Sequence, residues 1–144
     1  MSGIRSYICS MKRASLIFYW IARVIAAVIL LQTLYFKFTG TPESIFIFTQ
    51  VHMEPWGRIG VGVLELIASA LILINVTAWM GAMLALGLMG GAIMMHLTLL
   101  GIEVRGDGGQ LFFYAVIVAA CSVIVLAFNK ARIMDLISDI KQSN

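Results

Sequence analysis

The chain has 144 residues, of which 61% are hydrophobic and only 12% are charged, and its mean hydropathy is +0.99. Soluble domains carry roughly 25% charged residues, so this composition excludes an ordinary soluble fold and indicates an integral membrane protein. The net charge of +3 includes no basic cluster, which argues against nucleic acid as a partner.

Four apolar runs contain most of the hydrophobic residues: 16–36, 59–78, 79–101 and 111–128. Each is close to the ~20 residues with which a helix crosses a hydrocarbon core about 30 Å thick. A membrane β-barrel would instead show segments of roughly ten residues with alternating polarity, and none is visible. The sequence therefore predicts an all-α integral membrane protein, a four-transmembrane-helix bundle with short interfacial helices, as a single domain over residues 1–144.

The first run is too long for the apolar region of a cleaved signal peptide, so we expect it to remain as a signal anchor. Orientation follows from the lysines and arginines near the ends of the spans. Those in the terminal segments outnumber those in the opposite loops: Arg5, Lys12, Arg13, Lys130, Arg132 and Lys141 against Lys37, Arg58 and Arg105. This bias predicts that both termini are cytoplasmic and both long loops face outward, in what we expect to be a bacterial inner membrane.

The outer loop after the first run carries the signals of a helix start. Thr41 is a candidate N-cap, Pro42 stands at the first helical position, and Pro55 ends the pattern. We expect this helix to lie over the bundle with an apolar face of Ile45, Phe46, Phe48 and Val51. The third loop has four glycines within residues 101–110 and should form tight turns.

Other segments indicate how the bundle meets the membrane and how its helices pack. Apolar residues recur at helical spacing in 4–11 and 133–140, which predicts short helices on the inner surface. Small residues allow membrane helices to approach closely. Such residues are Gly57, Gly60 and Gly62 on the second span, and Gly87 and Gly91, a G-x-x-x-G pair, on the third.

Polar residues within the spans can be placed by depth, at about 1.5 Å of rise per residue. Glu65 falls ~12 Å below Gly57, and His96 falls ~7.5 Å below Gly101. Gln32 lies similarly below Lys37, so these three side chains occupy the outer half of three different helices. Arg23 belongs to the inner half, on the same face of the first helix as Lys37.

Glu65 is the strongest candidate for function, because an ionisable group near mid-membrane costs several kcal/mol and usually faces the bundle interior with a partner. His96 has a similar depth, so we expect the two to form one proton-sharing unit, bridged directly or through one water. Gln32 could also serve only helix packing, like Ser69 and Asn75. Arg23 cannot lose its charge, and we expect it to anchor the fold through a carboxylate, a carbonyl or the inner interface.

Cysteine and metal chemistry receive little support. Cys9 and Cys121 form no C-x-x-C pair, so neither a disulfide framework nor a thiol relay is predicted. A metal site would have to use His52 and Glu54 together with Glu65 and His96, without the tight helical spacing that ligand pairs show. We predict no metal.

Several segments in order resemble one family: "RVIAAVILLQTLYFKF", "EPWGRIGVGVLELIASALILI", "GAMLALGLMGGAIMMHLTLLGI" and "GDGGQLFF". They are similar to the DoxX-like membrane proteins over about residues 23–127. The resemblance implies a four-helix membrane bundle, linked in several members to respiratory or thiol redox chemistry, including a subunit of a thiosulfate:quinone oxidoreductase. A distant relative is an assembly chaperone for receptor subunits. This chain has no cofactor motif of its own.

Together these observations predict an outward-facing polar pocket with Glu65 and His96 as its catalytic pair. Its other residues would be Gln32, Tyr35, Lys37, Trp56 and Arg58 for binding, with the outer-loop carboxylates Glu43, Glu54, Glu103 and Asp107. A quinone headgroup would exchange protons with the pair and stack on Trp56 or Tyr35. We thus predict a redox- or quinone-linked membrane subunit, whose partners are the bilayer, an oxidoreductase subunit and a further copy of the chain. The alternatives are a small proton-coupled transporter and an assembly or partner protein.

Overall fold

The computed structural model describes residues 2–130, 133–134 and 138, with residues 2–11 described by their backbone alone. The helices, in chain order, are α1 (Ser2–Thr39), α2 (Pro42–Gln50), α3 (Trp56–Leu73), α4 (Ala78–Met95), a five-residue π-helix η1 (His96–Leu100) that continues α4, and α5 (Gln110–Phe128). The described residues include no strand, and four helices are long and apolar enough to cross a membrane. The predicted all-α fold with four spans is confirmed.

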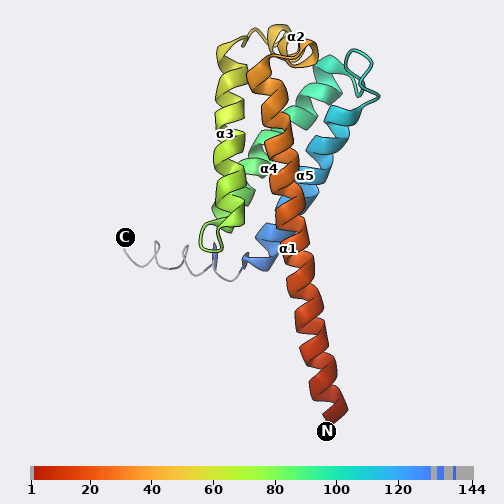
Figure 1. The fold of residues 1–144 in the computed structure, drawn as a ribbon, viewed down its shortest axis with the longest axis vertical. Coiled ribbons are helices and arrows are strands. Elements are labelled where there is room, and N and C mark those ends of the chain that lie inside the picture. The colour runs from red at the N-terminus through yellow and green to blue at the C-terminus, as the bar shows by residue number, and fades with distance from the viewer. Residues whose placement is uncertain (1, 131–132, 135–137, 139–144) are drawn as a thin grey trace.

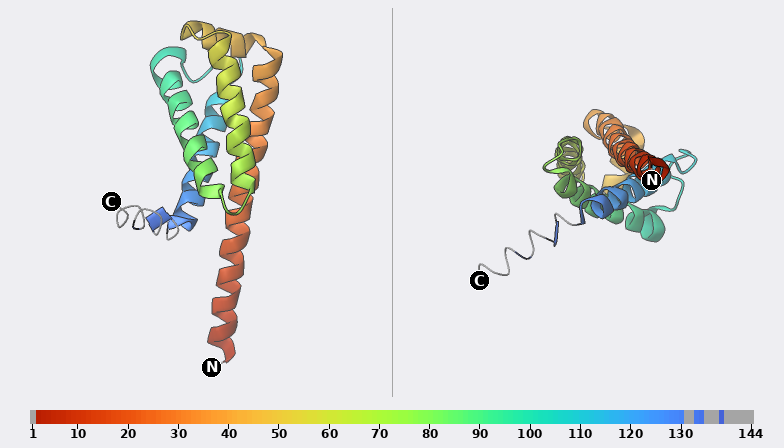
Figure 2. Two further views of the ribbon diagram at one scale, coloured as in Figure 1. Left: turned by 90° about the vertical axis from the view of Figure 1, so that its left-hand side faces the viewer. Right: turned by 90° about the horizontal axis from the view of Figure 1, so that it is seen from below.

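The four long helices form a bundle in which α1 packs between α3 and α5, and α4 closes the ring by contacting the same two helices (Figure 1). The short helix α2 lies across one end, beside the loop of residues 101–109. We call this the loop end. The amino terminus and the end of α5 lie at the opposite end, which we call the terminus end (Figures 1 and 2). A chain that crosses the membrane four times returns to the side on which it began, which agrees with this arrangement.

Helix α1 differs from the prediction at its start. Residues 4–11 were expected to form a separate surface helix, but they belong to the continuous helix Ser2–Thr39, whose first part extends beyond the bundle (Figure 1). No glycine or proline stands between Gly3 and Gly40, so the sequence offers no helix breaker there. Most of the helix predicted at 133–140 lies outside the described residues.

Alanine allows close packing in the half of the bundle nearer the termini. The buried core there includes Ala26, Ala68 and Ala82, each with no exposed surface. Helices α3 and α4 approach most closely where they leave their short turn. A Cβ added at Gly81 would lie 2.5 Å from the Ile72 backbone nitrogen and 2.8 Å from the Ala68 carbonyl oxygen. Only a residue without a side chain fits at position 81, and Gly81 therefore allows α4 to approach α3 closely.

The predicted G-x-x-x-G contact is wrong. A Cβ added at Gly87 or Gly91 would have nothing within 4 Å, and the same is true of Gly60. Helix α4 thus packs tightly against α3 at the terminus end through Gly81, whereas its glycines toward the loop end face open space. The space between the helices at the loop end is the site described below.

Helix α2 begins as predicted, with Thr41 at the N-cap position and Pro42 first in the helix. It ends at Gln50, earlier than the Pro55 expected from the sequence, because the backbone turns at His52 with a positive φ of 55°. The face of α2 toward the bundle buries Ser44 and Phe48. The predicted apolar face included Ile45, which is exposed instead.

The outer surface of the spans is apolar along its length. Large side chains such as Val28, Leu66, Met83 and Val123 are each more than two-fifths exposed. In water a continuous surface of this kind would not be tolerated, whereas in a bilayer it faces the lipid chains while each helix satisfies its own backbone. The lipid bilayer is therefore the environment of the bundle.

Candidate ligand cavity at the loop end

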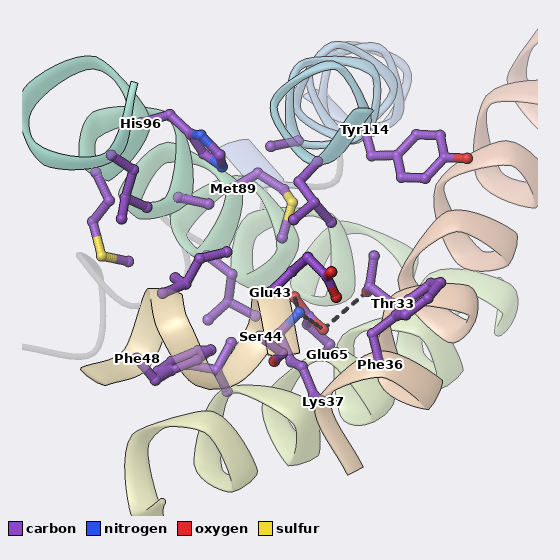
Figure 3. Close-up of a pocket in the computed structure, with 18 of the residues that line it drawn as sticks. Thr33, Phe36, Lys37, Glu43, Ser44, Phe48, Glu65, Met89, His96 and Tyr114 are labelled. Atoms are coloured by element: carbon purple, nitrogen blue, oxygen red, sulfur yellow. Dashed lines mark hydrogen bonds and ion pairs between the residues drawn. The ribbon is translucent and has the colours of Figure 1, made fainter. Parts of the chain in front are cut away.

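A cavity of about 450 Å³ lies between the four spans under α2 (Figure 3). Most of its wall is apolar, as in typical small-molecule sites of 300–1,000 Å³. Its polar and charged lining residues are Thr33, Lys37, Thr41, Glu43, Ser44, Glu65, His96, Arg105, Asp107, Gln110 and Tyr114. Helix α4 contributes only apolar side chains and glycines. The cavity reaches from the loops down to Glu65 in the middle of α3.

Glu65 is ion-paired inside this cavity. Its carboxylate lies 2.9 Å (Oε2) and 3.0 Å (Oε1) from Lys37 Nζ, and the Thr33 hydroxyl donates to Oε2 at 3.1 Å. The Glu65 side chain is 2% exposed and that of Lys37 is 16% exposed. Thr33 and Lys37 stand one helical turn apart on α1, so one face of that helix supplies both donors. A charge that is costly in the membrane is thereby paired.

Arg58 and Glu54 form a second ion pair, at the start of α3. The Arg58 guanidinium donates through Nε and Nη2 to the Glu54 carboxylate at 2.7–3.0 Å. Its Nη1 also donates to the backbone carbonyl of Lys37. These contacts join the start of α3 to the end of α1, directly above the Lys37–Glu65 pair. Neither residue lines the cavity. Their role is structural, because they hold the start of α3 against the end of α1.

His96 faces the cavity from the first position of η1. Its Nδ1 lies 2.8 Å from the carbonyl oxygen of Gly101, and its ring meets Phe112 edge-on at 5.7 Å between centroids. The side chain is buried, with 5% of its surface exposed. π-Helical turns within α-helices are frequent at functional sites. Here the turn carries the chain toward Gly101, whose carbonyl holds the imidazole.

Asp107 organises the loop beside His96. Its Oδ1 accepts hydrogen bonds from the backbone N–H groups of Val104 and Gly109, and Oδ2 accepts from that of Leu111. Burial alone would raise the pKa of Asp107. The three backbone hydrogen bonds, with a contribution from nearby His96, outweigh that effect and hold the pKa below its usual value. Asp107 therefore caps the first turn of α5 as a carboxylate.

Glu65 and His96 line the same cavity but do not hydrogen-bond to each other. Glu65 pairs with Lys37 and Thr33 on α1, and His96 pairs with the Gly101 carbonyl. Figure 3 shows the two side chains on separate sides of the cavity. The predicted direct bridge is therefore wrong, because each residue has its own partner; a shared role through a ligand between them stays a prediction.

Several residues predicted for the pocket lie elsewhere. Tyr35 is 67% exposed and Trp56 is 81% exposed, so neither can stack on a ligand in the cavity. Gln32 is also exposed and, like both aromatics, is absent from the wall. On α1 the cavity face carries Thr33 and Lys37, and Gln32 is turned about 100° from Thr33. Of the outer-loop carboxylates, Glu43 and Asp107 line the cavity, whereas Glu54 and Glu103 do not.

Some lining residues were missed by the sequence predictions. Thr33, Tyr114 and Arg105 face the cavity. The i, i+4 spacing of Thr33 and Lys37 was the available signal for Thr33. Arg105 was counted only for orientation; it adopts a positive φ of 53° and lies over the Phe46 ring at 5.7 Å.

Arg23 lies far from the cavity, at the terminus end of α3. It has no exposed surface, its Nε donates to the Ile72 carbonyl at 2.7 Å, and its Nη1 donates to Asn75 Oδ1 at 2.6 Å. The guanidinium also lies 4.0 Å from the ring centroid of Trp20, a cation–π contact. A carbonyl of the last turn of a helix is a natural partner for a cation.

The residues considered for a metal site do not come together. Among the described residues, no group of three or more His, Cys, Asp or Glu side chains is placed to hold an ion. His52 is exposed on the loop after α2, and the Glu54 carboxylate is engaged by Arg58.

Comparison with known proteins gives one match. The sequence profile of the DoxX family matches residues 18–98, which is more than half of the chain and includes Arg23, Lys37, Glu65 and His96. No curated protein and no solved structure gives a significant match. The chain belongs to the DoxX family of membrane proteins.

Proposed function

We propose that this DoxX protein binds a quinone-type ligand in the loop-end cavity and serves as the membrane subunit of an oxidoreductase. The observation that carries the proposal is an apolar cavity of about 450 Å³ with the Lys37–Glu65 pair on one wall and His96 on another. An amphipathic ring with two oxygens needs an apolar enclosure with a few well-placed polar groups. The membrane supplies such ligands directly.

The cavity residues have distinct roles in this proposal. Reduction of a quinone takes up two protons, and oxidation of the quinol releases them. Glu65 and His96 stand where they can exchange these protons with the ligand, while Lys37 balances the charge of Glu65. Phe36 and Tyr114, which line the cavity, replace Trp56 and Tyr35 as candidates for ring stacking. Electrons would come from a partner oxidoreductase subunit, because the sequence has only two cysteines and no cofactor motif.

Orientation completes the proposal. The excess of lysine and arginine in the terminal segments favours cytoplasmic termini. With that orientation in a bacterial inner membrane, the cavity would lie in the outer half of the bilayer. An oxidoreductase partner acting on the outer side would meet α2 and the 101–109 loop directly above the bound ligand.

Two neighbouring glycines offer a matched test. Gly91 lines the cavity, whereas Gly90 does not, and a Cβ at either would meet nothing within 4 Å. Gly91→Leu should therefore fill the cavity without disturbing the fold, and Gly90→Leu should place the same side chain outside it. Both changes raise helix propensity equally, by about 1 kcal/mol.

Binding of a short-tailed benzoquinone to protein in lipid nanodiscs would be measured by isothermal titration calorimetry. We expect saturable binding by the wild type, at least tenfold weaker binding by Gly91→Leu, and an unchanged affinity for Gly90→Leu. Equal affinity of the two variants, or no saturable binding by the wild type, would contradict the proposal and favour a role in assembly.

A further inference from the structure

The hydrogen-bond polarity of His96 is set by the protein. A backbone carbonyl oxygen can only accept, so the contact of 2.8 Å to Gly101 requires that Nδ1 carries the hydrogen. In the neutral imidazole the other nitrogen, Nε2, is then an acceptor. The ring is buried and lines the cavity, and no hydrogen bond to Nε2 is present among the described residues. His96 thus offers the ligand an acceptor.

Glu65 offers an acceptor as well. Its Oε1 accepts a hydrogen bond from Lys37 Nζ, and its Oε2 lies 2.9 Å from the same ammonium. The Thr33 hydroxyl, which also contacts the Leu30 carbonyl at 2.8 Å, lies 3.1 Å from Oε2. A carboxylate has about four lone-pair sites, so accepting capacity remains after these contacts, and Glu65 lines the cavity. Two separate walls of the cavity therefore present acceptors, His96 Nε2 and the Glu65 carboxylate.

We propose that the cavity selects the reduced, dihydroxy form of its ligand, a hydroquinone, over the corresponding quinone. The inference rests on the proposed function and adds the redox form to it. A hydroquinone can donate one hydroxyl to His96 Nε2 and the other to the Glu65 carboxylate. The carbonyl oxygens of a quinone would instead face lone pairs at both positions, and a buried polar group without its partner costs affinity.

This preference has a thermodynamic consequence for the bound redox couple. A protein that binds the reduced form tenfold tighter than the oxidised form raises the midpoint potential of a bound two-electron couple by about 30 mV. The bundle would then hold the ligand in its reduced state. An oxidoreductase partner that delivers electrons to the site would gain driving force from it.

The test compares three ligands that share one ring and one short tail: the hydroquinone, the quinone and the hydroquinone dimethyl ether. Binding to wild-type protein in nanodiscs is titrated anaerobically at pH 8. We expect the hydroquinone to bind at least tenfold tighter than either of the others, because only it can donate. His96→Gln, whose amide can also donate, should reduce the preference to about threefold, because the Glu65 acceptor remains, and Gly90→Leu should retain the full preference.

The outcomes separate the two proposals. Quinone binding that is as tight as hydroquinone binding or tighter, while remaining sensitive to Gly91→Leu, would overturn the selectivity and leave the proposed function standing. The absence of saturable binding by every ligand would overturn both. The wild-type comparison needs no variant, so it decides the inference even if His96→Gln fails to fold.

Discussion

Removing the cation beside Glu65 should be among the most damaging single changes in the bundle. Lys37→Met keeps the apolar stem and deletes the ammonium that lies 2.9 and 3.0 Å from the carboxylate oxygens. Because Glu65 is only 2% exposed, it cannot turn to water. Loss of one partner of a buried ion pair costs about 3–5 kcal/mol, which is a large part of the stability of a small domain.

The reverse change should cost less. Lys37 is 16% exposed at the end of α1, so after Glu65→Gln its ammonium can extend toward the interface, as long basic side chains do. The lost charge-assisted hydrogen bonds then amount to about 1–2 kcal/mol. In the double variant no buried charge remains. Lys37→Met with Glu65→Gln should therefore be more stable than Lys37→Met alone, by roughly 2 kcal/mol.

The assay is reversible unfolding in mixed detergent micelles, followed by circular dichroism, with Lys12→Met as the control because Lys12 is exposed near the start of α1. The reasoning fails if Lys37→Met costs less than about 1 kcal/mol, the upper end of the usual range for exposed pairs. It fails equally if the second substitution lowers stability further.

Three further predictions concern other parts of the chain. Arg23→Leu should leave insertion intact but lower the free energy of unfolding by about 2–4 kcal/mol, since it deletes two buried charged hydrogen bonds. Arg23→Lys should be milder. An Arg23→Leu variant with full stability but no ligand binding would contradict the structural role. Asp107→Asn should cost about 1–3 kcal/mol near neutral pH, because the amide nitrogen that replaces one oxygen cannot accept from the backbone N–H groups. Because the pKa of Asp107 is lowered from 3.8, this difference is fully present above pH 3.8 and should disappear as the pH falls through the lowered value; a pH-independent difference in melting temperature would argue against it. A reporter fused after Asn144 should be active only in the cytoplasm, and activity only outside would invert the orientation.

The spans were predictable from the sequence because their length is set by the bilayer. The run 111–128 corresponds closely to α5, Gln110–Phe128. The run 59–78 did not predict where α3 ends, at Leu73. The chain turns there without glycine or proline, next to the contacts of Arg23 with Ile72 and Asn75. This boundary depends on a residue from another helix, which local patterns do not contain.

The depth of the polar residues in the cavity was predictable from the sequence, but the residues to which they bond were not. The sequence placed Glu65 and His96 in the same half of the bundle, and it placed Arg23 and Lys37 on one face of α1. It did not show that this face meets α3, which is what pairs Lys37 with Glu65. The π-helix at His96 has no local signal either, and it is this turn that brings the imidazole to the Gly101 carbonyl.

The contacts of Arg23 have a consequence for biogenesis. Its Nε donates to the Ile72 carbonyl, 49 residues later in the chain, and at about 5–20 residues per second that partner is synthesised roughly 2–10 s afterwards. Until then the first span carries a charge that the lipid does not solvate. The first span should therefore remain beside the insertion machinery until α3 has emerged. In stalled nascent chains, cross-links from α1 to that machinery should persist at lengths that leave residue 72 inside the ribosome and disappear at lengths that let α3 enter the membrane.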